Sequence, residues 1–169
     1  MTNEPFFVPS YIVSSTTFLL RPHISHDKIH TIIYDKQGKI MFADKPLKII
    51  RSTCRMHGTT FTAIQRKAKL FFGNARHKLP ILLTTDYGNP CIFFPLFSPH
   101  SPNNTWINLH AITNIKEVGE ETIVTLSNST EVTLPIHYKS FNQQYVRAMM
   151  YYKYLVHQRS QFKLTITDY

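Results

Sequence analysis

The sequence contains little glycine, cysteine or acid, and each shortage excludes a class of protein. Its 169 residues include 5 Gly, 2 Cys and 10 Asp+Glu. Cys54 and Cys91 lie far apart, without a CxxC pair or a disulfide-dense spacing, so we expect two reduced thiols. No apolar run approaches the roughly 18 residues of a membrane-spanning helix, and the N-terminus lacks the basic stretch of a secretory signal. These absences predict a cytoplasmic protein without a membrane partner.

Motifs for catalysis are absent as well. The sequence has no GxSxG, GxxxxGKS/T, HExxH or GxGxxG. Cys54 lies between Arg51 and Arg55, whose charges could lower the pKa of its thiol, but no paired base is identifiable and a structural role is more common. We therefore predict no enzyme, no catalytic residue and no cofactor.

Three histidines, His23, His26 and His30, have a spacing that metal ligands also use. The segment follows Pro22 and is typical of a loop that enters a strand, so we do not expect the three side chains to share a face. No cysteine or carboxylate cluster completes a coordination shell, and a structural zinc site normally needs four ligands. The sequence therefore predicts no metal site.

What the sequence does contain is apolar and basic. Hydrophobic residues make up 43% and aromatic residues 13% of the chain, enough to bury a core and to exclude wholesale disorder. The length fits one domain, residues 1–169, and we detect no internal repeat and no linker.

The positive charge is concentrated in one quarter of the chain. Residues 45–85 contain nine basic residues and no acid, whereas the other basic and acidic residues, ten of each, cancel. Acids folded nearby could neutralise this window, which is the structural alternative. The functional alternative is that the window binds a polyanion, because a basic surface gains affinity when it displaces the counterions of phosphates. The basic residues are interleaved with Thr, Ser, Asn and aromatics, which favours nucleic acid over a membrane surface.

Up to about residue 138 the pattern is one of short β-branched or aromatic runs separated by turn residues. These runs predict strands and hairpins in residues 10–20, 28–50, 80–97 and 105–136. We expect an α+β fold that is mostly antiparallel β, a sandwich or half-barrel, with a short basic internal helix and a C-terminal amphipathic helix. No helix-turn-helix pair is evident.

The internal helix is predicted within residues 58–73. Thr59 or Thr60 can cap its start and a glycine its end. Phe61, Ile64, Ala68 and Phe71 would lie on one face for core packing, and Arg66 and Lys69 on another, with Lys67 beside them. A pair of strands is the alternative, because TTF and LFF favour β structure.

The second helix is predicted within residues 140–160. Ser140 and Gln143 have the spacing of a capping box. We expect its apolar face to pack on the sheet, with self-association as the alternative. The residues at helical spacing are Tyr145, Ala148, Met149, Tyr152, Leu155 and Val156.

The basic window also contains a motif with a known counterpart. Residues 53–61 (TCRMHGTTF) resemble the C-R-x-x-G-S/T-S/T-F/Y signature of the ComK competence transcription factors. Further segments follow in the family's order: residues 77–81 (HKLPI), 94–95 (FP), 106–107 (WI), 127–128 (SN) and 134–141 (LPIHYKSF), with Gln144 and Arg147 beyond. The resemblance covers about residues 10–165.

This resemblance implies a DNA-binding transcriptional activator of competence genes, which serve DNA uptake. It implies binding to paired AT-rich boxes of double-stranded DNA, largely through the minor groove, as a homodimer or a dimer of dimers. The family's C-terminal extension is mostly missing here, and residues 161–165 (QFKLT) keep only the Phe and Leu of an F-M-L-Y-P adaptor motif. Binding of a proteolytic adaptor of the MecA/ClpC type is therefore doubtful for this sequence.

The charge window and the resemblance lead to one set of expected DNA contacts. Seven side chains are expected to contact phosphates or the minor groove: Arg51, Arg55, Arg66, Lys67, Lys69, Arg76 and Lys78. Arg55 and Arg66 are candidates for insertion, because narrow A-tract minor grooves attract arginine. Trp106 is expected at the edge of the core, with base stacking as a weaker alternative.

Two other functions stay open: a single-stranded nucleic-acid or RNA-binding protein without sequence preference, and a module that binds an acidic protein.

Overall fold

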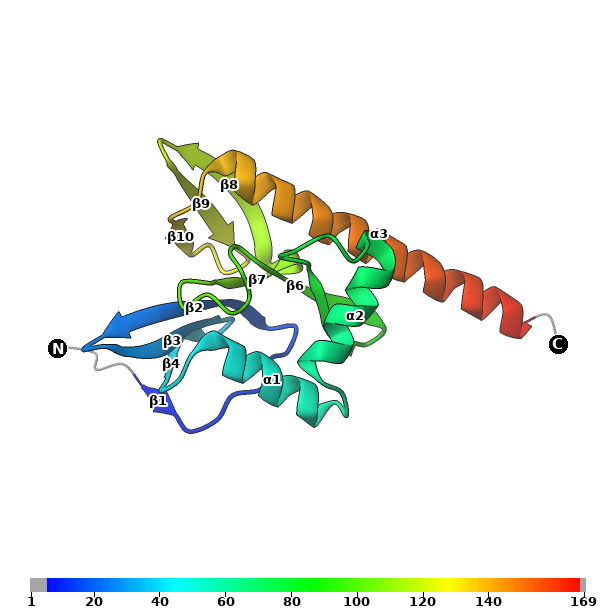
Figure 1. Ribbon diagram of the computed structural model, residues 1–169, viewed down its shortest axis with the longest axis horizontal. Helices are drawn as coiled ribbons and strands as arrows, with labels where there is room; N and C mark the ends of the chain where they lie inside the picture. The colour runs from blue at the N-terminus through cyan, green and yellow to red at the C-terminus, as the bar shows by residue number, and fades with distance from the viewer. Residues whose placement is uncertain (1–5, 168–169) are drawn as a thin grey trace.

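The computed structural model describes the backbone of residues 6–167 and the side chains of residues 6–161. The chain forms an α+β fold with one large sheet and one small sheet, and three α-helices (Figure 1). The large sheet has the strand order β1-β4-β3-β2-β7-β6-β5 and is antiparallel except where β1 pairs with β4. Its strands are β1 (Phe7–Val8), β2 (Thr17–Ser25), β3 (Lys28–Asp35), β4 (Gly38–Phe42), β5 (Ile81–Asp86), β6 (Asn89–Pro95) and β7 (Trp106–Asn108).

Side chains alternate between two cores on the two faces of the large sheet. In β6, Cys91 and Phe93 belong to one buried cluster, and Ile92 and Phe94 to the other. Both faces of this strand are covered, which explains why its sequence is a continuous apolar run rather than an alternating one.

Helix α1 (Pro46–Met56) and the first half of α2 (Phe61–Phe72) cover one face of the sheet, whereas Ala68, Phe71 and Phe72 of α2 pack with the cluster on the other face. Leu47, Ile50 and Cys54 recur along α1 at helical spacing and are buried with Ile64 of α2. The two helices are consecutive, joined by residues 57–60, in which Gly58 has the left-handed φ of 72°. Because residues 28–50 were predicted to be strands, α1 and the consecutive helix pair correct the sequence-based expectation.

The opposite face is covered by α3 (Tyr138–Thr167) and the three-stranded sheet. That sheet has the order β10-β9-β8 and follows a short 3₁₀ helix, η1 (Leu109–Ala111). Its strands are β8 (Ile112–Val118), β9 (Glu121–Leu126) and β10 (Glu131–Leu134). Figure 1 shows α3 running across the molecule and extending beyond it toward the C-terminus. No helix in the described part of the chain is long and apolar enough to cross a membrane.

Helix α3 confirms the predicted amphipathic helix and corrects two of its details. It begins at Tyr138, so Ser140 lies inside the first turn and the predicted capping box does not form. Ala148 and Leu155 are buried as expected, whereas Met149 and Val156 are exposed. The side chains of residues 162–165, which include part of the adaptor-like segment, lie outside the described residues.

Candidate nucleic-acid interface

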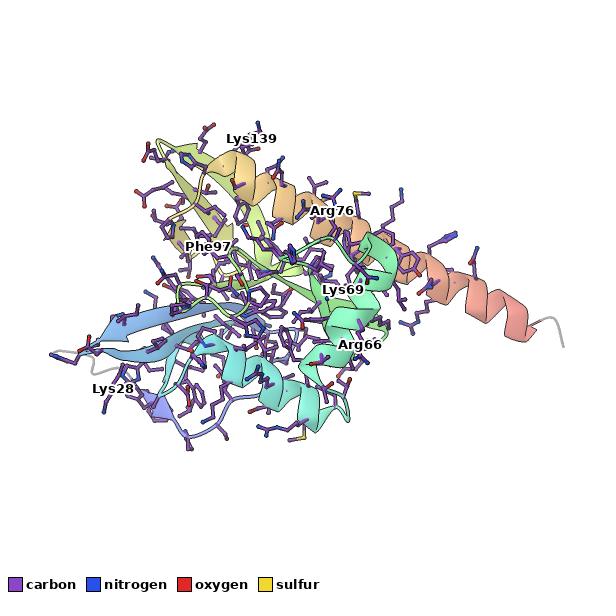
Figure 2. All side chains as sticks on the ribbon, in the orientation of Figure 1. Lys28, Arg66, Lys69, Arg76, Phe97 and Lys139 are labelled. Carbon is purple, nitrogen blue, oxygen red and sulfur yellow. The ribbon has the colours of Figure 1, made fainter. Side chains whose placement is uncertain are left out.

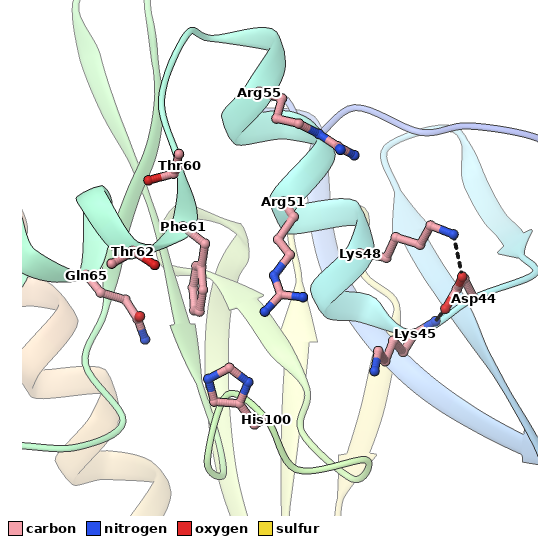
Figure 3. A pocket seen from close by; sticks show the side chains of 10 residues that line it. All are labelled: Asp44, Lys45, Lys48, Arg51, Arg55, Thr60, Phe61, Thr62, Gln65 and His100. Carbon is pink, nitrogen blue, oxygen red and sulfur yellow. Dashed lines mark hydrogen bonds and ion pairs between the residues drawn. The ribbon is translucent and has the colours of Figure 1, made fainter.

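One face of α1 presents a row of cations beside a cavity. Lys48, Arg51 and Arg55 recur at intervals of three and four residues, so they share a face of the helix, and all three are exposed. They line a cavity of about 530 Å³ between α1 and α2. Figure 3 shows Arg51 extending from α1 toward His100, which belongs to the loop after β6.

Thr60 fixes where α2 begins, opposite this row. It is the N-cap residue, and its hydroxyl oxygen accepts a hydrogen bond from the Ala63 amide at 3.1 Å. This bond satisfies one of the amides that a helix start leaves unpaired. Helix α2 therefore begins directly after the turn and places Thr62 and Gln65 on the cavity wall. The predicted internal helix is confirmed, and the alternative strand pair is wrong.

A second basic cavity adjoins the first one. It has a volume of about 300 Å³ and is lined by Lys69, Arg76 and Lys78, and it shares Gln65 and His100 with the larger cavity. Figure 2 shows Arg66, Lys69 and Arg76 following one another along α2 and the segment after it. We call the whole surface the basic face, defined by Lys45, Lys48, Arg51, Arg55, Arg66, Lys69, Arg76 and Lys78.

The segment that carries Arg76 and Lys78 is held from the other side of the molecule. The buried side chain of Gln144 in α3 donates hydrogen bonds to the Lys78 carbonyl at 2.8 Å and to the Pro95 carbonyl at 2.9 Å. Its own carbonyl oxygen accepts one from Arg147 at 2.9 Å. Lys78 has a φ of 57°, a left-handed value that is uncommon for a residue other than glycine. Gln144 thus positions the end of the basic face.

Carboxylates neutralise almost none of this charge. Among the described residues, the one ion pair joins Lys48 to Asp44 at 2.7 Å, and this contact lowers the pKa of the Asp44 carboxyl. The other eight basic residues of the 45–85 window form no ion pair in the described part of the chain, although the charge of Lys45 also lowers the pKa of Asp44. The structural alternative, that acids folded nearby neutralise the window, therefore finds support only around Asp44.

Five of the seven expected contact residues line the two basic cavities: Arg51, Arg55, Lys69, Arg76 and Lys78. Lys67 lies on the other flank of α2, where it lines grooves with Leu82 and Thr85 of β5. Arg66 is exposed and lines neither basic cavity. Consecutive residues on a helix are about 100° apart, which separates Lys67 from its neighbour Arg66.

Sequence reasoning missed several residues of this face. His100 and Gln65 line both cavities, and Lys45 and Lys48 extend the cationic row of α1. Lys45-Pro46 followed by Leu47, Ile50 and Cys54 was the available signal for α1, because proline is common at the first helical position. No local pattern pointed to His100, whose loop reaches the site only through the fold.

Nucleophilic chemistry at the cysteines is not supported. Cys54 is fully buried, and burial raises the pKa of its thiol to about 11. This agrees with the structural role preferred from the sequence, and the lowered pKa considered as its alternative does not occur. Burial raises the pKa of the Cys91 thiol to about 12. Both cysteines are free and buried.

The histidine segment is a hairpin rather than a loop that enters a strand. His23 and His30 lie opposite each other on β2 and β3, so the expectation that they would not share a face is wrong for this pair. His26 lies in the connecting turn, with a φ of 48°. Among the described residues, no group of three potential metal ligands occurs.

Comparison with known proteins assigns the chain to a family. A model of the ComK protein family matches residues 8–161. The Competence transcription factor of Bacillus subtilis (strain 168) is 32% identical over 140 residues, which cover 82% of this chain and 71% of that protein. No solved structure gives a significant match. The chain belongs to the ComK family.

Proposed function

We propose that this protein is a competence transcription factor that binds double-stranded DNA through the basic face. The observation that carries the proposal is the unneutralised charge of that face: exposed cations from α1, α2 and residues 76–78 surround two adjoining cavities, with Asp44 as the one acid among the lining residues. Phosphates bind such a surface because they exchange condensed counterions for fixed cations. The relative's name, Competence transcription factor, agrees with this assignment.

The preferred DNA is AT-rich, with a run of A and a run of T, contacted largely through the minor groove. A-tracts have a narrow and strongly negative minor groove that attracts inserted arginine side chains. Arg55 and Arg66 remain the proposed groove contacts, because both are exposed and neither is paired with a described carboxylate. The paired runs imply two copies of the chain on one site, so we include a homodimer or a dimer of dimers in the proposal.

A fluorescence-anisotropy titration tests this function. The A/T duplex is compared with a GC-rich duplex of equal length at several salt concentrations. We expect tighter binding to the A/T duplex and a steep fall in affinity with salt, because phosphate contacts release counterions. Equal binding to both duplexes would contradict the shape-specific part of the proposal, and no binding at low salt would contradict DNA binding itself.

The single-stranded alternative has weaker support. Base stacking needs exposed aromatic rings. Phe61 lines the larger cavity and packs against Trp106, with ring centroids 6.0 Å apart, and the two residues are 6% and 1% exposed. The same titration with a single strand of the A/T sequence separates the two functions, since the alternative predicts that this strand binds at least as tightly as the duplex.

A further inference from the structure

A third cavity lies at the start of α1, beside the basic face, and its polar lining consists largely of hydrogen-bond donors. It has a volume of about 260 Å³, far more than the roughly 10–15 Å³ that one water needs. Lys45 and Arg51 line it from α1, and His100, Ser101 and Asn104 line it from the loop after β6. No carboxylate belongs to this lining.

Asn104 supplies the observation that points to a ligand. Its side chain is 2% exposed, and its carbonyl oxygen accepts hydrogen bonds from the Leu96 amide at 3.1 Å and the Phe97 amide at 2.9 Å. These two bonds fix the orientation of the side-chain amide. Its Nδ2 is buried and has no hydrogen-bond partner. A buried donor without a partner is costly, and Asn104 belongs to the lining of the cavity, so an acceptor that bound beside this residue would remove that cost.

The N-terminus of α1 adds a partial positive charge. Lys45, the N-cap residue, makes no side-chain cap hydrogen bond, and the first turn holds no acid. Lys45, Pro46 and Leu47 line the cavity, which places the partial positive charge of the helix start against it. Asp44 is engaged elsewhere: its two oxygens accept from the Lys45 amide at 2.8 Å and from the Lys48 ammonium at 2.7 Å.

We propose that this cavity binds one phosphate group, held by Arg51, Lys45, the Nδ2 of Asn104 and the start of α1. A phosphate presents several acceptor oxygens and negative charge, which match a lining of cations and unpaired donors. The phosphate can come from a DNA backbone or from a free phosphate compound, and the first source rests on the proposed function. In either case Arg51 belongs both to this cavity and to the basic face.

Trp106 provides the readout, because it lines the cavity and is the single tryptophan of the chain. Its fluorescence is followed while sodium phosphate or dimethyl phosphate is added at constant ionic strength, with chloride as the balancing anion. We expect a saturable change with phosphate. A response that chloride reproduces, or one that does not saturate, would overturn the proposal.

Two variants locate the response. Arg51→Gln removes an exposed cation, so its fold is expected to persist. Asn104→Asp keeps an oxygen for the Leu96 and Phe97 amides but replaces the Nδ2 donor with a negative oxygen. Each is expected to weaken phosphate binding about tenfold or more, since charge-assisted hydrogen bonds are lost. Lys116→Gln removes the same charge on β8 as Arg51→Gln and should bind phosphate like the wild type. Unchanged binding by Arg51→Gln would overturn the proposal even if Asn104→Asp does not fold.

Competition identifies the source. If the A/T duplex displaces phosphate from the wild-type cavity, the group is a DNA backbone phosphate. If the duplex binds and phosphate stays bound, the cavity serves a free phosphate compound. Duplex binding is measured separately by anisotropy. If the protein fails to bind DNA but still gives the saturable response to phosphate, the proposed function is contradicted and the phosphate site is supported.

Discussion

Gln144 joins α3, the end of the basic face and strand β6 through one buried amide. Replacing it with leucine would leave the carbonyls of Lys78 and Pro95 without their present donors. We expect Gln144→Leu to lower the free energy of unfolding by about 1–3 kcal/mol, the usual cost of unsatisfied buried polar groups. Urea unfolding measures this. The neighbouring exposed Gln143→Leu is the matched control, and an equal loss in both variants would contradict the role of the two bonds.

The buried thiols of Cys54 and Cys91 predict how stability changes at alkaline pH. In the unfolded chain they ionise near their ordinary pKa of 9.0, whereas burial raises the folded values to about 11 and about 12. The unfolded state therefore loses protons first. The free energy of unfolding should be unaffected by these groups below about pH 9 and should fall as the pH rises toward 11 and 12.

Urea unfolding at pH 8 and pH 10 under reducing conditions checks this prediction. Tyr151, whose pKa burial raises to about 12, contributes to the same loss, so the test compares variants rather than relying on the wild type alone. The decrease between the two pH values should be smaller in Cys54→Ala than in the wild type. Equal decreases would mean that the Cys54 thiol has the same pKa in both states.

Helix α2 carries cations on two flanks, and only one flank belongs to the basic face. Arg66 and Lys69 are close on one side, whereas Lys67 lies beside β5. If both residues neutralise phosphates, the double variant Arg66→Gln/Lys69→Gln should flatten the log–log salt dependence of duplex binding by about 2. Lys67→Gln should change it much less. Anisotropy titrations at several salt concentrations measure these slopes. Similar changes in slope for the two variants would contradict the assignment of only one flank of α2 to the DNA-binding surface.

The elements differ in how much of them the sequence determines locally. For α2, the cap at Thr60, the apolar spacing and the final glycine agree, and the structure has them all. For α1, the β-branched Ile49 and Ile50 favour a strand, but the residues form a helix because its apolar face packs against the sheet. The start of α3 was misplaced because a capping-box pattern at Ser140 was stronger than any signal at Tyr138. Tertiary packing therefore overrides local preference where the signals conflict.

For the molecule as a whole, the charge pattern identified the candidate surface better than the predicted secondary structure did. The acid-free window of residues 45–85 contains α1, α2 and every residue that defines the basic face, so counting charges found this surface before its elements were known. His100 and Asn104 were not predictable in this way, because they belong to an uncharged loop that meets α1 only after the sheet has formed. Contacts between distant segments carry no signal in a single sequence. The donor-lined cavity is thus a property of the fold.

Four of the ten acids gather on another part of the molecule. Glu117, Glu121 and Glu131 lie on strands of the three-stranded sheet and Glu120 lies in the turn between β8 and β9, and Lys116 is the one basic residue between residues 112 and 134. Figure 1 shows this sheet at the upper left of the view, α1 below it on the other side of the large sheet, and α2 to the right. Such a separation makes the protein an electrical dipole, which orients it as it approaches a polyanion.

The acids of this sheet also repel a polyanion at long range, and this repulsion predicts a kinetic effect without a contact. The triple variant Glu117→Gln/Glu120→Gln/Glu121→Gln should speed association with the A/T duplex at an ionic strength of about 0.01 M, where the Debye length is about 30 Å. At about 0.15 M, where it is about 8 Å, the rate should match the wild type. Stopped-flow anisotropy gives both rates. Dissociation should be unchanged at either salt, because no contact is lost. A change in dissociation would mean instead that the acidic sheet lies against the bound DNA.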